Sequence, residues 1–288
     1  MEAIAERTIQ IPKPLPWQAK LIADIREKEP RLVVAPVGRR AGKTHCGLLI
    51  AITTPKGLLA GKDVAWLGPN DKVIAESKSW FKAWCGPLIN GASPGGIGYA
   101  LENGSIIDWW PAGPNAKQPV RSRGYGIVIV DECGFIPGLK LLVDAAVRPA
   151  LAIDEGMLVL IGTPFGKTGS DFYDFHLEAK RTGLAYHAPS SVNPLLKTAE
   201  LDRLRKTTDE LTFRQEYGAE FLDRAGSLLR RDQIRKGEPP QDFKLIAFGL
   251  DIALSSKQRA DYTALVIAGL DLEDRYYHEE ELTFRVNR

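Results

Sequence analysis

The sequence predicts an α/β fold built on a central, mostly parallel sheet, and three short apolar runs carry that prediction. Residues 32–35 (LVVA), 127–130 (IVIV) and 157–161 (MLVLI) contain only apolar side chains. Continuous apolar runs of this length are typical of strands buried on both faces of a parallel sheet. We expect the residues that follow these strands to meet at the carboxyl edge of the sheet, where open α/β sheets bind ligands.

The first run leads into a loop ending in Gly42-Lys43-Thr44, and an apolar helix (46–51) follows. This layout is typical of a P-loop, in which backbone N–H groups hold phosphate, the lysine adds charge and the threonine can bind magnesium. Three residues rather than the usual four separate Gly38 from Gly42, and Val37 stands at the expected first position. The flanking strand and helix disfavour a chance match. The predicted nucleotide-binding residues of the loop are Gly38, Arg39, Arg40, Ala41, Gly42, Lys43 and Thr44.

The other two strands end in side chains that suit phosphate chemistry. Asp131-Glu132 follows the second strand. In a P-loop enzyme the first carboxylate at such a strand end supports magnesium and the second polarises the attacking water. Thr163 follows the third strand, and its hydroxyl can sense a γ-phosphate. An ordinary strand-to-loop turn is the alternative for Thr163.

Upstream of the loop, Pro12, Pro14 and Pro16 keep the chain extended, and a helix with an apolar face begins at Trp17-Gln18. A glutamine just before a P-loop can read the adenine edge with its amide, and a surface glutamine at a helix start is the alternative. Three tryptophans in the next strand and helix are expected in the core rather than in a base-stacking platform: Trp66, Trp80 and Trp84.

Composition limits the possible classes of fold and function but does not select one. The chain has 288 residues, enough for one large or two ordinary domains. The formal net charge is only +2, so a DNA-binding surface would have to be a local patch. The three cysteines form no CxxC pair and therefore signal neither zinc nor a disulfide framework. Neither a membrane-length apolar run nor a signal-peptide core is present in the sequence.

The remaining segments of the first 222 residues alternate between predicted elements and loops. Residues 86–96 are rich in glycine, proline and serine and predict a mobile loop. The polar loop 111–126 carries Lys117, Arg121 and Arg123, which either contact DNA phosphates or a neighbour's nucleotide or are simply solvated. The other predictions are strands at 63–67 and 184–188, a hairpin at 99–110, and helices at 72–84, 170–181, 199–206 and 210–217.

A charged, polar stretch at 223–244 predicts a linker, and the pattern changes after it. Residues 245–253, 262–270 and 275–281 predict three successive strands of a β-meander. Asp251 lies within the first of them. An unpaired carboxylate in an apolar strand is costly, so Asp251 is expected to bind metal or pair with a cation. A strand-edge aspartate is the alternative.

Taken together, the motifs resemble the large terminase subunit of tailed bacteriophages, the motor that packages DNA into proheads. They are WQ at 17–18, GRRAGKT at 38–44, IVIVDE at 127–132, IGTP at 161–164 and GLDIA…DYTAL at 249–265. The resemblance implies an ASCE-type P-loop ATPase domain at 1–222, a linker or lid at 223–244, and the beginning of an RNase H/RuvC-like nuclease domain at 245–288.

The resemblance also implies roles for single residues. Lys43 and Thr44 bind phosphate and Mg²⁺, Asp131 supports Mg²⁺, and Glu132 is the catalytic base. Thr163 couples hydrolysis to movement, and Asp251 matches the first metal-binding aspartate of a nuclease that uses Mg²⁺ or Mn²⁺. Because two-metal cleavage needs several carboxylates, and further strands and helices of that fold would lie beyond Arg288, we expect this chain to hydrolyse ATP without cutting DNA efficiently.

In such a motor, an arginine stabilises the charge on the leaving γ-phosphate. Arg39 and Arg40 are placed to act in cis, whereas Arg123 or Arg148 could act from a neighbouring subunit. The implied partners are double-stranded DNA, the portal protein of the prohead, the small terminase subunit and further copies in a ring, expected to be a pentamer. A monomer is expected in solution, and the implied location is the host cytoplasm and, transiently, the prohead.

Three other classes of function remain open at this point. A helicase or translocase of the wider ASCE group would separate strands. A small-molecule P-loop kinase would not respond to DNA. A non-enzymatic ATP-binding assembly subunit would lack turnover, which the intact Lys43 and Glu132 speak against.

Overall fold

The computed structural model describes residues 9–112, 120, 123–223, 240, 242–251, 263–273, 276–278 and 282–284. The chain forms two compact units, Met1–Ala225 and Gly226–Arg288. Lys117 and Arg121 of the predicted basic loop lie outside the described residues, as does most of the predicted linker. Within the described residues, no helix has both the length and the apolar character that crossing a bilayer requires.

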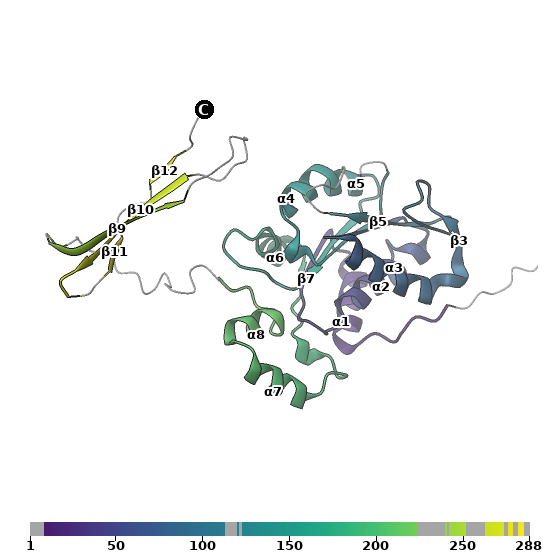
Figure 1. The fold of residues 1–288 in the computed structure, drawn as a ribbon. Coiled ribbons are helices and arrows are strands. Elements are labelled where there is room, and N and C mark those ends of the chain that lie inside the picture. The colour runs from purple at the N-terminus through teal and green to yellow at the C-terminus, as the bar shows by residue number, and fades with distance from the viewer. Residues whose placement is uncertain are drawn as a thin grey trace, which may run out of the picture. The chain divides into compact units, whose positions relative to one another are not determined.

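The first unit is organised around an eight-stranded sheet in the order β3-β4-β5-β2-β6-β7-β1-β8 (Figure 1). Neighbouring strands are parallel from β5 through to β8 and antiparallel in the β3-β4-β5 edge. The prediction of a mostly parallel central sheet is therefore confirmed. The strands are β1 Leu32–Pro36, β2 Val64–Gly68, β3 Ile89–Ala92, β4 Gly98–Leu101, β5 Ile106–Pro111, β6 Ile127–Asp131, β7 Met157–Gly162 and β8 Leu184–Ala185.

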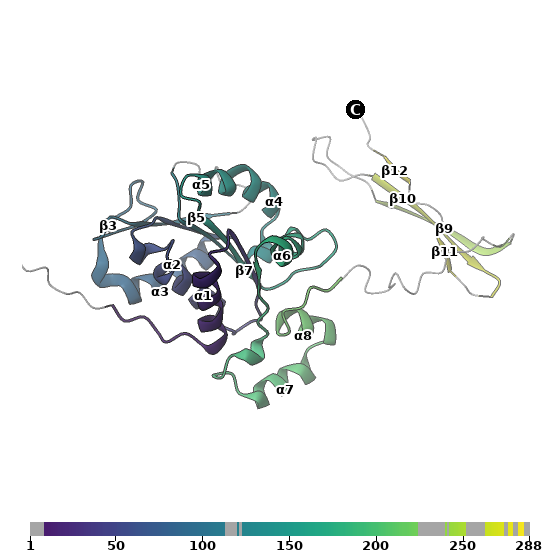
Figure 2. The same ribbon diagram turned by 180° about the vertical axis from the view of Figure 1, so that it is seen from behind.

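Alternate residues of the central strands point to opposite faces, and helices cover both faces (Figures 1 and 2). In β1, Val33 and Ala35 belong to the core beneath α1 (Pro16–Lys28), α2 (Lys43–Thr53) and α3 (Asp71–Cys85). Leu32 and Val34 belong to the core on the other face. That face is covered by α4 (Leu139–Leu142), a π-helical turn (Val143–Val147), α5 (Arg148–Ala152) and α6 (Asp171–Thr182). Two buried cores explain why these strands read as continuous apolar runs.

The structure differs from the sequence-based expectation in two places. The loop predicted over 86–96 is wrong in part, because β3 pairs there with β4. The sequence pattern does not predict the helical stretch from α4 to α5. Pro149 interrupts its pattern, and the π-helical turn lies immediately before the helix whose first turn holds this proline. Proline is tolerated in a first helical turn, where its missing N–H would have no partner.

Two short helices, α7 (Thr198–Thr207) and α8 (Glu210–Glu216), follow β8 and agree with the predicted helices at 199–206 and 210–217. A 3₁₀ turn, Ser190–Val192, precedes them. These segments are far from the loop after β1 in sequence, but hydrogen bonds join them to it, as described below.

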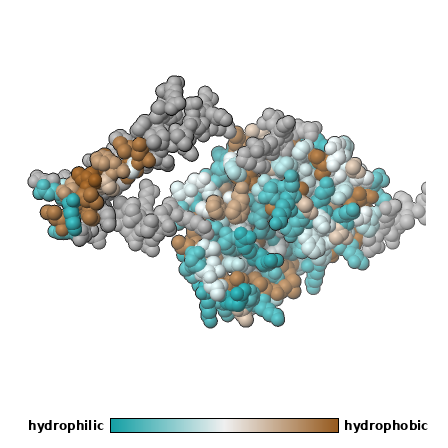
Figure 3. Space-filling model, viewed as in Figure 1, coloured by the Kyte–Doolittle hydropathy of each residue, from teal (hydrophilic) through white to brown (hydrophobic). Residues whose placement is uncertain are grey.

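The second unit is a small antiparallel sheet made of β9 (Phe243–Asp251), β10 (Thr263–Asp271), β11 (Tyr276–His278) and β12 (Leu282–Phe284). β10 pairs with each of the other three. The predicted succession of three strands is confirmed, and β12 is an additional strand. Asp251 is the last residue of β9 and pairs with Ala264 of β10. Figure 3 shows apolar side chains gathered on this unit; Leu245, Ile246, Phe248 and Leu250 are exposed.

Candidate functional site

The loop between β1 and α2 leaves the sheet at Gly38. Val37 is still a strand-like position: it is fully buried, it forms a parallel bridge with Ala188, and its N–H donates to the Gly162 carbonyl at 2.8 Å. The Gly38 N–H donates to the Ala188 carbonyl at 2.9 Å. A Cβ on Gly38 would lie 2.6 Å from the Tyr217 carbonyl oxygen. This close approach of two backbones requires a glycine at position 38.

The second half of the loop turns back toward α2 through left-handed backbone conformations. Arg40 has φ 63° and Gly42, the N-cap of α2, has φ 87°. Glycine adopts this region without the steric cost that other residues meet. The indole N–H of Trp17 donates to the Ala41 carbonyl at 3.0 Å and holds the turn against α1. The backbone N–H groups at the start of α2 are thereby presented at a helix N-terminus, which favours an anion.

Gln18, the predicted reader of adenine, braces this turn. Its Nε2 donates to the Gly42 carbonyl at 2.8 Å, and its Oε1 accepts from the Leu15 N–H at 2.8 Å. The side chain is only 2% exposed, although it borders the cavity described below. Both ends of the amide are thus engaged with backbone, and the role of Gln18 toward a base stays a prediction.

Four predicted residues from two strand ends come together. The ammonium of Lys43 lies 2.8 Å from Oε1 of Glu132, and the hydroxyl of Thr44 donates to Oδ2 of Asp131 at 3.2 Å. The α2 residues follow β1, whereas the acidic pair ends β6, and β7 separates these two strands in the sheet. Parallel strands bring their carboxyl ends to one edge, so residues almost 90 positions apart meet there.

Asp131 is fully buried, and its environment disfavours a negative charge. Burial raises the pKa of its carboxyl to about 7, and the neighbouring Glu132 adds to the increase. The charge of Lys43 and the hydrogen bonds from the Glu132 N–H and Thr44 act in the opposite direction. A cation beside Asp131 would favour its charged form.

The donor set suits Mg²⁺ better than a metal held by protein alone. Within the described residues, no group of three or more His, Cys, Asp and Glu side chains could hold a metal ion. Mg²⁺ in nucleotide sites takes one or two protein oxygens and completes its shell with waters and phosphates. The Thr44 hydroxyl and the Asp131 carboxylate are such a pair.

Glu132 is held in an unusual position. Its φ is 51°, a left-handed conformation that costs a non-glycine residue on the order of 1–2 kcal/mol. One oxygen contacts Lys43, and the other, Oε2, is buried and has no hydrogen-bond partner among the described groups. An acceptor oxygen without a partner beside a phosphate loop could bind a water molecule.

Thr163 is also buried, and its hydroxyl donates to the Val37 carbonyl at 3.3 Å. The loop after β7 packs closely against the loop after β6, since a Cβ on Gly134 would lie 2.3 Å from the Thr163 carbonyl oxygen. Thr163 therefore joins the start of the phosphate loop to the segment that follows the acidic pair.

Arg39 and Arg40 both border the cavity, but other contacts hold the loop at these positions. The guanidinium of Arg39 pairs with the carboxylate of Glu216 in α8. The Arg39 carbonyl accepts from the Ser190 hydroxyl at 2.6 Å, and the Arg40 carbonyl accepts from the Asn193 amide at 2.6 Å. The segment from 190 to 217 is thus tied to the loop at three points.

The structure does not bring Arg123 and Arg148 to this site. Arg123 lies 3.7 Å from Asp63 and 3.8 Å from Asp108. Arg148 bonds to Asp144 and Glu178, each at 3.0 Å. Both arginines lie outside the lining of the cavity. Asp251 belongs to the second unit.

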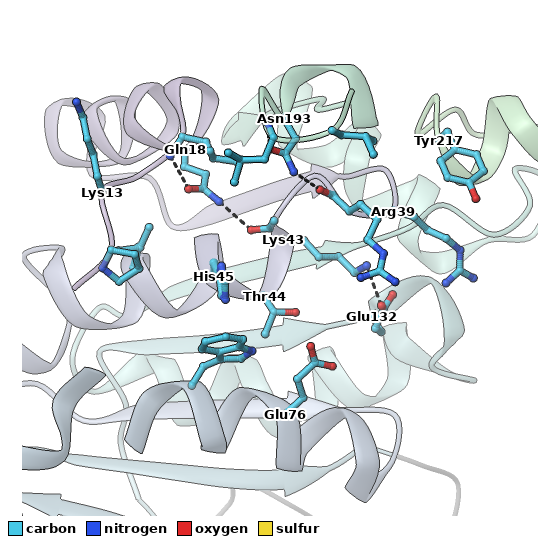
Figure 4. A pocket seen from close by; sticks show the side chains of 18 of the residues that line it. Lys13, Gln18, Arg39, Lys43, Thr44, His45, Glu76, Glu132, Asn193 and Tyr217 are labelled. Atoms are coloured by element: carbon cyan, nitrogen blue, oxygen red, sulfur yellow. Dashed lines mark hydrogen bonds and ion pairs between the residues drawn. The ribbon is translucent and has the colours of Figure 1, made fainter. Parts of the chain in front are cut away.

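A cavity of about 1300 Å³ opens around the loop (Figure 4). Lys43, Thr44 and Glu132 border it together with residues that the sequence did not single out. In this view His45 and Glu76 lie below Asn193 and Tyr217. Trp80 also borders the cavity. A signal for His45 existed in the sequence, because it directly follows Lys43-Thr44. Asn193 and Glu216 carry no local signal, since only tertiary contacts bring them here.

Comparison with known proteins places this geometry in context. No protein-family model matches the chain. The large terminase subunits of Thermus phage G20c and Thermus virus P23-45 are each 32% identical over 136 residues, which cover 40% of this chain and 27% of those relatives. The chain is similar to large terminase subunits. The resemblance inferred from its motifs is confirmed.

Solved structures share the fold. The ATPase domain of the Thermus phage P74-26 large terminase matches 73% of this chain and 94% of its own length, with 23% identity and a TM-score of 0.52. The large terminase of bacteriophage D6E in complex with ADP matches 93% of this chain and 69% of its own length, with 13% identity and a TM-score of 0.58. The large terminase of bacteriophage HK97 matches 98% of this chain and 64% of its own length, with 17% identity and a TM-score of 0.57. The first unit therefore has the P-loop ATPase fold of the large terminases.

Proposed function

We propose that this chain is the ATP-hydrolysing motor subunit that moves double-stranded viral DNA into proheads. The observation that carries the proposal is the meeting of Lys43, Thr44, Asp131 and Glu132 at one edge of the sheet. The fold shared with large terminases and the ADP and ATP-γ-S complexes of the D6E terminase support it.

The chemistry follows from the positions of the side chains. The loop amides and the N-terminus of α2 bind the α- and β-phosphates, and the Lys43 ammonium binds the β- and γ-phosphates. These phosphates compete with Glu132 for Lys43, which lies 2.8 Å from it. Glu132 then accepts a proton from the attacking water at its partnerless Oε2. Thr163, bonded to the loop through Val37, transmits the loss of the γ-phosphate.

Thr44 and Asp131 would hold Mg²⁺. When bound, Mg²⁺ neutralises charge that develops on the phosphates during transfer. Asp131 serves this role because a cation offsets the burial that otherwise favours its protonated form.

An arginine completes the catalytic site. Either Arg39 or Arg40 acts in cis, or Arg123 or Arg148 acts from a neighbouring subunit. We propose that the subunits form a pentameric ring. Each arginine would be replaced by alanine, and each variant protein would be mixed with a Lys43→Ala subunit. An arginine finger contributes about 10³–10⁵-fold. If none of the four substitutions lowered ATPase activity more than about tenfold, this part of the proposal would be wrong.

The partners follow from the motor role. We propose that the subunit is monomeric in solution, that it assembles with the portal protein and the small terminase subunit on proheads in the host cytoplasm, and that it grips DNA through phosphates. Grip should then weaken with salt and show little sequence preference. We assign 1–222 to the ATPase, 223–244 to a linker and 245–288 to the first strands of a nuclease domain in which Asp251 binds Mg²⁺ or Mn²⁺.

The central experiment measures ATP turnover with and without double-stranded DNA and proheads. Glu132→Gln should bind ATP but lose at least about 100-fold in turnover, because the base is removed and the shape is kept. Glu155→Gln is the matched control, since its carboxylate is 84% exposed and lies outside the cavity lining. Turnover that DNA does not stimulate and that survives Glu132→Gln would overturn the proposal.

Fork-unwinding and phosphate-transfer assays, together with ATP turnover, separate the other candidates. A helicase would unwind a fork in the presence of ATP, whereas the proposed motor translocates an intact duplex. A small-molecule kinase would transfer phosphate to an acceptor regardless of DNA. A non-enzymatic ATP-binding subunit would show no turnover in the wild type.

A further inference from the structure

The predicted base reader, Gln18, raises the question of where the nucleobase lies. Its amide oxygen and nitrogen both form hydrogen bonds with backbone groups, and the residue is only 2% exposed. Its polar edge is committed to the loop. The base, a flat and largely apolar group, therefore needs another surface in the cavity.

The phosphate loop sets the direction in which the base leaves. Lys43 and Glu132 mark the γ-phosphate end, because a P-loop lysine reaches the β- and γ-phosphates. The loop amides hold the α- and β-phosphates. In Figure 4 the ion pair of Lys43 and Glu132 lies at one end, and His45 and Lys13 lie on the opposite side of Thr44. The base should lie toward His45, away from Glu132.

Trp80 offers the surface on that side. It projects from α3, borders the cavity, and is 42% exposed, whereas Trp84 is 7% exposed and Trp66 is fully buried. Its ring lies perpendicular to that of His45, at 88° with the centroids 4.7 Å apart. Trp84 supports both rings, at 6.3 Å from Trp80 and 5.1 Å from His45. The indole is thus held in place while part of it faces the cavity.

The chemistry of this side suits a neutral aromatic ligand. Pro12 and Leu15 add apolar surface to the same cavity. A single exposed tryptophan needs no explanation by itself. A tryptophan that neighbouring rings hold in the wall of a phosphate-binding cavity suits base binding, because aromatic side chains stack on nucleobases whatever the base.

We propose that the nucleobase of the bound nucleotide stacks on Trp80, and that Trp80 with His45 forms the base subsite. This inference rests on the proposed ATPase function, since it takes the ligand to be a nucleoside phosphate. It assigns to Gln18 the work of holding the loop and to Trp80 the work of holding the base.

The test compares ADP with inorganic tripolyphosphate, which has phosphates and no base. Trp80→Ala should weaken ADP binding about tenfold and leave tripolyphosphate binding within about twofold, as expected for the loss of one stacked base. Trp80→Phe should keep most of the ADP affinity. Leu195→Ala is the control, because Leu195 is 82% exposed and lines the cavity from the segment before α7.

A second readout does not depend on the stability of Trp80→Ala. ADP, but not tripolyphosphate, should quench tryptophan emission in the wild type, and this quenching should disappear in Trp80→Phe although ADP still binds. An unchanged ratio of ADP to tripolyphosphate affinity in Trp80→Ala, or a changed ratio in Leu195→Ala alone, would overturn the assignment of the base subsite. Wild-type protein that binds neither ligand would overturn the proposed ATPase function itself.

Discussion

Gly38→Ala tests the idea that the phosphate loop depends on a close backbone approach. The added Cβ would lie 2.6 Å from the Tyr217 carbonyl oxygen, 2.7 Å from the Ser190 hydroxyl and 2.8 Å from the Ser190 nitrogen. Ordinary contact begins at 3.4 Å, so the two backbones must separate by about 0.8 Å. The hydrogen bond from the Ser190 N–H to Tyr217, now 2.7 Å long, lies directly in the way.

The magnitude follows from three terms. Overpacking costs about 1–3 kcal/mol, and loss of the Ser190 hydrogen bond about 1 kcal/mol. Alanine restricts the unfolded chain more than glycine does, which returns about 0.4–1 kcal/mol. The free energy of unfolding should therefore fall by about 2 kcal/mol. With a urea dependence of about 2 kcal/mol per molar, the midpoint falls by about 1 M.

Urea unfolding followed by tryptophan emission suits this measurement, because all 6 tryptophans belong to the first unit. Gly86→Ala is the matched control: a Cβ there would meet nothing within 4 Å, and its φ of −46° suits any residue. Its midpoint should stay the same or rise slightly. A Gly38→Ala midpoint within about 0.2 M of wild type would refute the reasoning from close approach.

Two further substitutions test buried polar groups. Tyr125→Phe removes the 3.0 Å hydrogen bond that Tyr125 donates to Asp108. Because Asp108 is 1% exposed and its Oδ1 has no partner among the described groups, the free energy of unfolding should fall by about 2 kcal/mol. The decrease should be smaller when Asp108 is already leucine, and urea midpoints measure both changes. Burial of His176 lowers its pKa from 6.5 to about 4, so the unfolded chain binds more protons between these values and stability rises with pH by up to about 3 kcal/mol. The raised pKa of Asp131 makes stability fall as pH rises between 3.8 and about 7, which opposes the effect of His176. The contribution of His176 is therefore the difference in stability between wild type and His176→Phe across this pH range. Equal slopes of stability against pH in the two proteins would contradict it.

The central strands and the phosphate loop could be predicted from sequence because their signals are local. Residues buried on both faces leave continuous apolar runs, and a glycine loop before a helix has few alternatives. The edge strand β3 left no such signal. It contains Asn90 and Gly91 and is mostly exposed, so its conformation comes from pairing with β4 rather than from its own side chains.

The contacts around the loop could not be predicted for a related reason. Glu216 meets Arg39 across 177 positions, and Asn193 meets the Arg40 carbonyl across 153. Neither residue belongs to a sequence pattern, because a single glutamate or asparagine does not indicate its partner. Apolar character alone predicts that Trp80 lies in the core with Trp66 and Trp84, but it does not separate a residue facing a core from one facing a cavity.

The short spacing of the glycines has a structural cause. Val37, which stands where the usual spacing puts the first glycine, is still bound within the sheet: its N–H bonds to Gly162, and its carbonyl accepts from Thr163. The Val37 side chain packs in the core, so position 37 needs no glycine. One residue later, at Gly38, a Cβ would lie 2.6 Å from the Tyr217 carbonyl oxygen and 2.8 Å from the Ser190 nitrogen. The strand pairing extends to Val37, and Lys43 reaches Glu132 at 2.8 Å. In this loop the first glycine directly follows Val37, the last residue of the strand pairing, and it lies where the chain passes close to Tyr217 and Ser190.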